Sequence, residues 1–470
     1  CSGMRSMPTT RLKMRHFMAQ DASGTPTPSA ATLVRHMGLW ALVIYGVGDM
    51  LGSGIYALIG KAAGMLGNAI WLGFAVSMVA ALLTALSYAS LGSRYPRAAG
   101  AAYVTHRAFG RPFLSYLVGL AVMASGLTSM GTQSRAFSEY FSALVPGVPP
   151  VAIIIGFILV LTAVNFWGIK ESTWLNIVCT TVEVSGLLII IAVAWRYWGG
   201  MNYLDVPPVV SLPGVLGPAL IMQGAVLTFY SFVGFEDMIN VVEEVEDPQR
   251  TFPRAIVLAM IVVTLIYFAV SISAVSVVPY AQLAQSKQPL VDVVRTAAPG
   301  FPPFVFSAIA LFAITNTALL NYIMGSRLAY GMACQGLLPG FLGCIHPRRR
   351  TPHLAILCLM GLVLVLAVGF DIKPLAKGTS VLLMAVFVVI NGALLVLQRR
   401  RSEAKGFFEV PWIVPAGGLL VSLSLLLHAK APELLLAGCI LVVIAGLYFL
   451  VRPRNVTEET FVEAEHDNLE

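Results

Sequence analysis

Apolar runs of about 20 residues alternate with short polar segments along almost the whole chain, and such runs span a bilayer core of roughly 30 Å as helices. Lipid offers the backbone no hydrogen bonds, so each run must satisfy its own as a helix. The pattern predicts an all-α membrane protein with twelve transmembrane helices, near 37–65, 68–92, 112–143, 149–168, 172–198, 216–245, 254–277, 302–335, 353–370, 374–397, 409–428 and 432–451. These helices form one domain at 37–451, between a polar tail at 1–36 and an acidic tail at 452–470.

The first apolar run is interrupted within 48–60, GDMLGSGIYALIG, where Gly52-Ser53-Gly54 falls near mid-membrane depth. Glycine weakens a helix and lets other groups approach the backbone closely. An unpaired backbone group in hydrocarbon is costly, so a break at this depth lines a cavity or packs against protein. Free N–H groups at the start of the following half-helix favour an anion. The alternative is a simple packing kink, because glycine is common in membrane helices.

The sixth run contains a second irregularity, FYSFVGFEDM at 229–238, in which Glu236-Asp237 follows Gly234. Carboxyl groups at membrane depth are expensive and are interpreted as functional by default. The first and sixth runs are five apart, as expected when two five-helix halves repeat with inverted topology. Interrupted helices at corresponding positions of two such halves indicate the binding site of a transporter.

Composition and charge placement narrow the class of protein. The chain has 470 residues, of which 57% are hydrophobic and 11% charged, with a mean hydropathy of +0.82, and this excludes an ordinary soluble domain. The net charge of +7 does not indicate a nucleic-acid partner, because the basic residues lie in short loops between apolar runs. Lysine and arginine are concentrated on one side of the predicted spans, which places both termini in the cytoplasm of a multi-pass protein of the cell (inner) membrane.

Several kinds of site are not expected from the sequence. No group of histidine, cysteine and carboxylate residues has metal-ligand spacing, so we expect no metal and no cofactor. No nucleophile–base constellation indicates an enzyme. No GxxxxGK[ST] loop is present, which argues against a nucleotide-driven pump.

Four motifs carry a family resemblance. They are GSGI at 52–55, NFWGIKESTWLN at 165–176, FVGFE followed by EEVEDPQRTFPRAI within 232–256, and SRLAYGMACQGLLPGFLGCIHPRRRTP at 326–352. With them the chain resembles the amino acid–polyamine–organocation transporter superfamily, especially its bacterial members similar to cationic amino acid transporters. The resemblance implies a five-plus-five inverted repeat with broken helices 1 and 6 plus two extra helices.

The resemblance also implies where an amino acid would bind. Its carboxylate is expected at the backbone N–H groups of Ser53, Gly54 and Ile55. Its ammonium group is expected at carbonyl oxygens of both broken helices, which fall at Met50, Tyr230 and Val233. Tyr230 and Phe235 are interpreted as walls or gates of the site, with core packing as the alternative for both rings.

Two residues depart from the family pattern. Many relatives carry a lysine where this chain has Glu183, and a neutral residue where it has Asp49. A carboxyl group in apolar surroundings can bind and release a proton near neutral pH, so Glu183, with or without Asp49, is a candidate for proton coupling. Alternatively, Glu183 is a neutral strut against the first helix, and Asp49 contacts the cationic side chain of lysine, arginine or ornithine.

Three further charged residues lie within or beside the family motifs. Glu236 matches an acidic position of the family, where it braces the sixth helix or contributes to coupling. Asp237 is interpreted as a cap of the half-helix that follows it. Arg327 is interpreted as a cytoplasmic anchor or a gate contact.

The sequence therefore predicts a secondary active transporter that moves amino acids by alternating access, with proton coupling as a hypothesis. The expected partners are a small-molecule amino acid, the lipid bilayer and protons. Two alternatives remain open: an exchanger of amino acids or polyamines, and a sensor that binds an amino acid without transporting it.

Overall fold

The computed structural model describes residues 35–97, 100–207, 217–286, 288–369, 373–400, 403, 405–429 and 431–451. Only the backbone is described at 53, 57, 58, 139, 143, 169–171, 303, 373–379, 432, 433, 436 and 451. Both predicted tails, 1–36 and 452–470, lie outside the described ranges except for positions 35 and 36. The described residues are mostly helical, and their only β pairing is an isolated bridge between Met37 and Val245. The prediction of an all-α protein is confirmed for this part of the chain.

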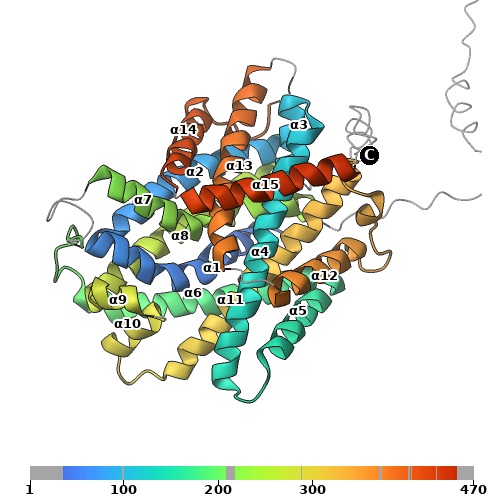
Figure 1. Ribbon diagram of the computed structural model, residues 1–470. Helices are drawn as coiled ribbons and strands as arrows, with labels where there is room; N and C mark the ends of the chain where they lie inside the picture. Colours follow the sequence, from blue (N-terminus) through green and yellow to red (C-terminus); the bar gives the residue numbers. More distant parts are fainter. Residues whose placement is uncertain are drawn as a thin grey trace, which may run out of the picture. The chain divides into compact units, whose positions relative to one another are not determined.

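The long helices follow one another in chain order (Figure 1). They are α1 Leu39–Leu66, α2 Ile70–Arg94, α4 Pro112–Leu144, α5 Pro150–Trp167, α6 Ile169–Ala194, α8 Pro248–Val277, α11 Pro303–Cys334, α12 His353–Gly369, α13 Lys373–Arg399, α14 Ile413–Leu427 and α15 Ala431–Val451. The sixth predicted span is divided into α7 Pro218–Phe229 and the 3-10 segments η3 Tyr230–Phe232 and η4 Phe235–Glu244.

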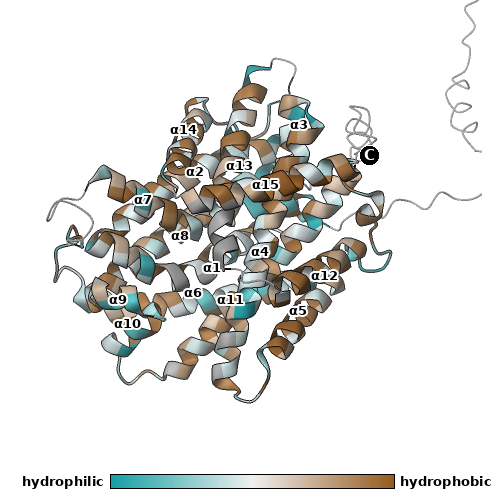
Figure 2. Ribbon diagram, in the orientation of Figure 1, coloured by the Kyte–Doolittle hydropathy of each residue, from teal (hydrophilic) through white to brown (hydrophobic). Residues whose placement is uncertain are grey.

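Length and composition identify a multi-pass membrane protein. Among the described residues, nine helical stretches are long and apolar enough to cross a membrane, and three further apolar helices are shorter. Large apolar side chains on the outer helices are exposed, among them Val160 on α5, Val365 on α12 and Val442 on α15. Figure 2 shows α5 and α12 as strongly hydrophobic. Such surfaces are stable in lipid rather than in water.

Shorter helices, which the hydropathy pattern did not predict, lie between the long ones. They are α3 Gly100–Phe109, α9 Tyr280–Gln285 and α10 Pro289–Ala297, together with η1 Gly67–Ala69, η2 Trp195–Tyr197 and η5 Gly340–Gly343. In α10 the buried apolar residues Leu290, Val293, Val294 and Ala297 share one helical face. That face is too short to be distinguished from a loop by hydropathy, and α10 is held by packing against α1, α6 and α8.

The two interrupted elements are held side by side. The α1 helix packs against α6, α7, α8 and α11, as well as against η3 and η4. Before α1 begins, the Met37 N–H donates to the Glu244 carbonyl over 3.0 Å, and the Glu246 N–H donates to the Met37 carbonyl over 3.0 Å. These bonds fix the start of α1 beside the end of η4.

Candidate functional site

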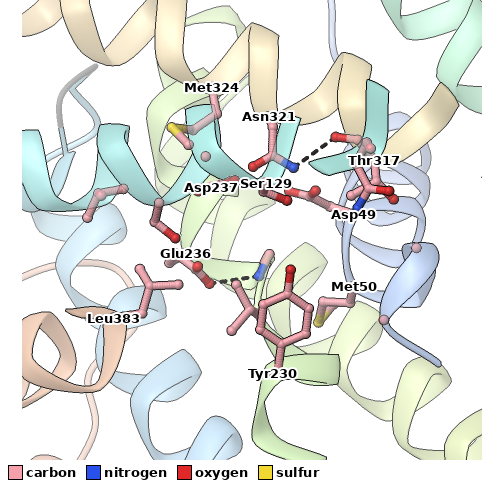
Figure 3. A pocket seen from close by; sticks show the side chains of 18 residues that line it. Asp49, Met50, Ser129, Tyr230, Glu236, Asp237, Thr317, Asn321, Met324 and Leu383 are labelled. Atoms are coloured by element: carbon pink, nitrogen blue, oxygen red, sulfur yellow. Dashed lines mark hydrogen bonds between the residues drawn. The ribbon is translucent and has the colours of Figure 1, made fainter. Parts of the chain in front are cut away.

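Both helix interruptions face one cavity in the described part of the protein. Its walls come from α1, α4, η3, η4, α11 and α13, and its lining residues are Asp49, Met50, Gly52, Gly54, Val122, Ser125, Gly126, Ser129, Gln133, Tyr230, Val233, Gly234, Glu236, Asp237, Thr317, Asn321, Met324 and Leu383 (Figure 3). The cavity is small: its volume, counted as the space open to the centres of water molecules, is about 40 Å³. That is room for a few waters. Side chains must therefore move before a larger molecule can enter.

The interruption of α1 lies at Gly52, whose φ of −27° and ψ of −164° are not helical. A Cβ at this position would lie 1.9 Å from the Thr317 Oγ1 of α11, so only glycine fits here. The helix resumes after Gly52, and the first N–H groups of a helical segment have no carbonyl partner within it. These groups can therefore bond to a ligand.

The second interruption lies at Val233-Gly234, between η3 and η4. Gly234 has a φ of 128°, in the region that favours glycine, and a Cβ there would lie 3.0 Å from the Asp49 carbonyl carbon. The Gly234 N–H donates to Oε2 of Glu236 over 2.9 Å, drawn as a dashed line in Figure 3. If Glu236 braces the sixth helix, it needs a bond of this kind to the backbone at the interruption. The bracing role itself stays a prediction.

Tyr267, on α8, joins the two interruptions. Its buried hydroxyl lies within hydrogen-bonding distance of the Met50 carbonyl of α1 and, at 2.6 Å, of the Ser231 carbonyl of η3. A hydroxyl has one hydrogen to donate, so the two carbonyls share a single donor. Nothing near Tyr267 in the chain distinguishes it from other aromatic residues of a membrane helix, so the sequence did not indicate this role.

Three carboxyl groups face the cavity. Asp49 comes from α1, and Glu236 and Asp237 come from η4, and none of them is more than 4% exposed. Among the described residues that line the cavity there is no lysine, arginine or histidine. The site therefore combines backbone groups released from two helices with acidic side chains, and this combination suits a small molecule that carries a positive group.

The comparison with known families agrees with this geometry. A family model described as "Amino acid permease" matches residues 37–454. The chain belongs to the amino acid permease family. The permease is therefore a membrane transporter and not an enzyme.

Curated relatives cover most of the permease. It is 26% identical over 424 residues to the branched-chain amino acid permease BcaP of Bacillus subtilis, which covers 86% of this chain and 90% of the relative. It is 28% identical over 405 residues to the methylthioribose transporter of the same organism, with 81% and 85% covered. It is also 28% identical over 387 residues to the vacuolar cationic amino acid transporter 4 of Arabidopsis thaliana, with 78% and 64% covered.

Some of the residues that the resemblance assigned to substrate binding line the cavity, and others do not. The cavity is lined by Met50, Gly54, Tyr230 and Val233, and the Ser53 backbone lies in the same interruption. Ile55 and Phe235 are fully buried and are not among the lining residues. The Phe235 ring lies 5.9 Å from that of Tyr88 and 5.3 Å from that of Phe387, between ring centroids, so it packs in the core beside the cavity rather than forming its wall.

Glu183 also lies outside the cavity lining. It is fully buried on α6, and neither carboxyl oxygen has a hydrogen-bond partner among the described residues. One turn earlier, Thr180 receives a bond of 2.8 Å from the Asn316 side chain of α11. A Cβ on Gly48 would lie 2.0 Å from the Thr180 Oγ1, so α1 approaches α6 very closely here. Glu183 is thus near the interrupted helix but behind it.

Arg327 forms a buried ion pair and is not a surface anchor. Its side chain has no exposed surface, and its Nε donates to Oε1 of Glu244 over 2.8 Å. Its Nη1 donates to Oδ1 of Asn165 over 2.7 Å. The interpretation as an anchor is wrong, because these contacts join α11, η4 and α5 in the protein interior. A role as a gate contact stays a prediction.

Removing the Tyr267 hydroxyl tests whether it holds the two interruptions together. We expect Tyr267→Phe to destabilise the purified permease by about 1–3 kcal/mol, because buried carbonyls lose their shared donor. The melting temperature in detergent measures the effect. Tyr197→Phe, at a site 39% exposed, is the matched control and should change stability by less than about 0.5 kcal/mol. An equal melting temperature for both variants would contradict the bridging role.

Proposed function

We propose that the permease is a secondary active transporter that moves amino acids across the cell (inner) membrane by alternating access. The observation that carries the proposal is the meeting of two interrupted helices, α1 and α7–η4, at one buried polar cavity. A zwitterion pairs its two ends with the opposite dipoles of such helix ends. Relatives named as an amino acid permease and a cationic amino acid transporter support the same substrate class.

The proposed architecture has twelve spans, arranged as a five-plus-five inverted repeat with two extra helices and both termini cytoplasmic. The placement of interruptions in the first and sixth predicted spans supports it. A bundle that contains the interrupted helices moves against the remaining scaffold and exposes the cavity to each side in turn. Because the cavity holds only a few waters, substrate entry requires such a movement.

In the proposed complex the substrate carboxylate accepts hydrogen bonds from the N–H groups of Ser53, Gly54 and Ile55. The ammonium group donates to the carbonyl oxygens of Met50, Tyr230 and Val233. The Met50 carbonyl already faces the Tyr267 hydroxyl, and its second lone pair is available to the ammonium group. The position of Met50, Tyr230 and Val233 in the cavity lining supports this assignment.

Transport is tested with the purified full-length chain in liposomes. A thermal-shift screen of the twenty amino acids first finds ligands, since a ligand of the folded state raises its melting temperature. Uptake of the best labelled ligand is then compared with that of protein-free liposomes. Saturable uptake supports the transporter, whereas binding without uptake or exchange would mean a sensor. Uptake that requires amino acid or polyamine on the opposite side would mean an obligatory exchanger.

We also propose that Glu183 carries a coupled proton. Its full burial without a hydrogen-bond partner favours a group that is neutral in at least one state of the cycle. Glutamine keeps the shape of the side chain and cannot release a proton. We therefore expect Glu183→Gln to abolish the accumulation that an acidic exterior drives, while counterflow of labelled substrate between equal pools continues. Accumulation that still follows the imposed pH gradient in this variant would rule out the coupling role.

A further inference from the structure

Asp49 and Asp237 form a carboxyl pair across the two interruptions. Asp49 lies three residues before Gly52 in α1, and Asp237 lies three residues after Gly234 in η4. Each is 4% exposed, and both line the cavity. A Cβ on Gly234 would lie 3.1 Å from the Asp49 carboxyl carbon, and the Asp237 N–H donates to the Gly234 carbonyl over 3.1 Å, so both residues lie beside the same glycine. Figure 3 shows both residues at the cavity, with Asn321 and Ser129 nearby. The pair thus connects two segments whose separation must change if the cavity opens.

Two carboxyl groups that share one small buried cavity need a positive partner. Two carboxylates are both acceptors and repel each other, so they can share a hydrogen bond only when one of them carries a proton. The Asp49 Oδ2 is buried and has no hydrogen-bond partner among the described residues, although Asp49 lines the cavity. An unused acceptor on a residue that lines the cavity marks a place for a donor that arrives with a ligand.

Among the residues that the structure describes, no neighbouring cation supplies that donor. The titratable groups that surround the pair are Tyr45 on α1, Tyr88 on α2, Glu183 on α6, Tyr230 on η3, Glu236 and Glu244 on η4, Tyr267 on α8 and Arg327 on α11. Of these, Arg327 alone is cationic, and it is paired with Glu244. Glu236 already accepts the Gly234 N–H. A proton or a cationic ligand must therefore compensate the charge of the pair.

We propose that Asp49 and Asp237 form a site at which a proton and the ammonium group of a cationic amine compete. With the cavity empty of ligand, one proton bridges the two carboxyl groups. When the ammonium group binds, it donates hydrogen bonds to both carboxylates and the bridging proton leaves to solvent, so one positive charge replaces another. The inference rests on the proposed function, because it takes this cavity as the substrate site. It adds a preference for amines with a positive group beyond the α-ammonium.

The test compares L-ornithine with L-norleucine, which has a methyl group where ornithine has its side-chain ammonium and is otherwise nearly the same size. Binding to the purified full-length permease is measured by calorimetry in buffers of different ionisation enthalpy, which reports the protons released. We expect about one proton released per ornithine and none per norleucine. Ornithine affinity should rise about tenfold per pH unit while the free pair holds its proton, and norleucine affinity should stay constant.

Variants test whether the released proton comes from Asp49 and Asp237. Asp237→Asn keeps the shape of the side chain and should abolish proton release and lower ornithine affinity by about tenfold or more. Asp205→Asn changes an exposed carboxyl group outside the cavity and should leave both quantities as they are. The comparison of the two ligands on the unaltered protein needs no variant, so it remains decisive if Asp237→Asn fails to fold. Putrescine, which has no carboxylate, separates diamines from dibasic amino acids: release of a proton by both means that the ammonium group is sufficient.

Three results would overturn the proposal that a proton and an ammonium group compete for this site. They are ornithine binding without proton release, equal release by norleucine, and a failure of both ornithine and putrescine to bind. If ornithine does not bind but neutral amino acids are taken up into liposomes, only the inference fails and the proposed function stands. If no amino acid is bound or transported, the proposed function fails as well.

Discussion

Arg327→Met is expected to destabilise the permease by about 3–5 kcal/mol, because it leaves the Glu244 carboxyl group buried without its positive partner. The side chains of both residues have at most 1% of their surface exposed, so water cannot replace the lost contact. Asn165 would lose a donor at the same time. The loss should appear as a lower melting temperature and a lower yield of folded protein in detergent.

Two control variants distinguish the stability lost with the buried ion pair from the stability lost when any arginine is replaced. Glu244→Met combined with Arg327→Met removes both charges and should recover most of the stability, since a buried pair replaced by apolar groups costs little. Arg250→Met breaks a pair of 3.9 Å whose side chains are more than half exposed, and it should cost less than about 1 kcal/mol. A single Arg327→Met variant as stable as the unaltered protein would show that the pair does not hold α11 to η4.

Gly52→Ala is expected to have the second large effect, because its Cβ would overlap the Thr317 side chain at 1.9 Å. Overpacking of this kind costs about 1–3 kcal/mol, and here the strain falls on the interruption of α1 that faces the cavity. Every 1.4 kcal/mol or so of strain in the ligand-binding conformation lowers affinity about tenfold. Melting temperature and ligand binding of the same preparation measure the two effects.

The clash can be relieved at its partner. Thr317→Ala removes the Oγ1 that meets the new methyl group, leaving a Cβ contact of 3.1 Å that a small shift can absorb. The double variant should therefore recover folding in part. Gly438→Ala, on α15, meets nothing within 4 Å and should not reduce stability. If Gly52→Ala behaved like Gly438→Ala, the close approach of α11 to the interruption would be wrong.

Hydropathy predicted the long helices well because helix formation in a membrane depends mainly on the residues of the helix itself. Each apolar run must satisfy its own backbone groups in lipid, so run length alone indicates a helix such as α8 or α13. The interruptions at Gly52 and Gly234 were predictable for the same reason. Glycines and carboxyl groups inside apolar runs contradict the local pattern, and such contradictions are expected at functional sites.

The short helices and the site contacts could not be predicted this way. The hydroxyl of Tyr267 meets a carbonyl 217 positions away in the sequence, and Arg327 meets Glu244 83 positions away. Neither pairing leaves a pattern in the neighbouring residues. Phe235 lies beside the cavity rather than in its wall, because the direction of a side chain after an interruption depends on how η4 packs against α2 and α11.

The sequence by itself determined that this chain is a bundle of membrane-spanning helices, that two of the helices are interrupted, and which family it belongs to. These features depend on local composition and on motifs, because lipid penalises every unpaired backbone group wherever it occurs. The tertiary structure alone decided that Asp237 and Asp49 line the same cavity, that Tyr267 bridges the two interruptions, and that Glu183 is not among the lining residues. Those contacts depend on which faces of the helices pack together. The packing is determined by side chains far apart in the chain, which meet only when the whole bundle has formed.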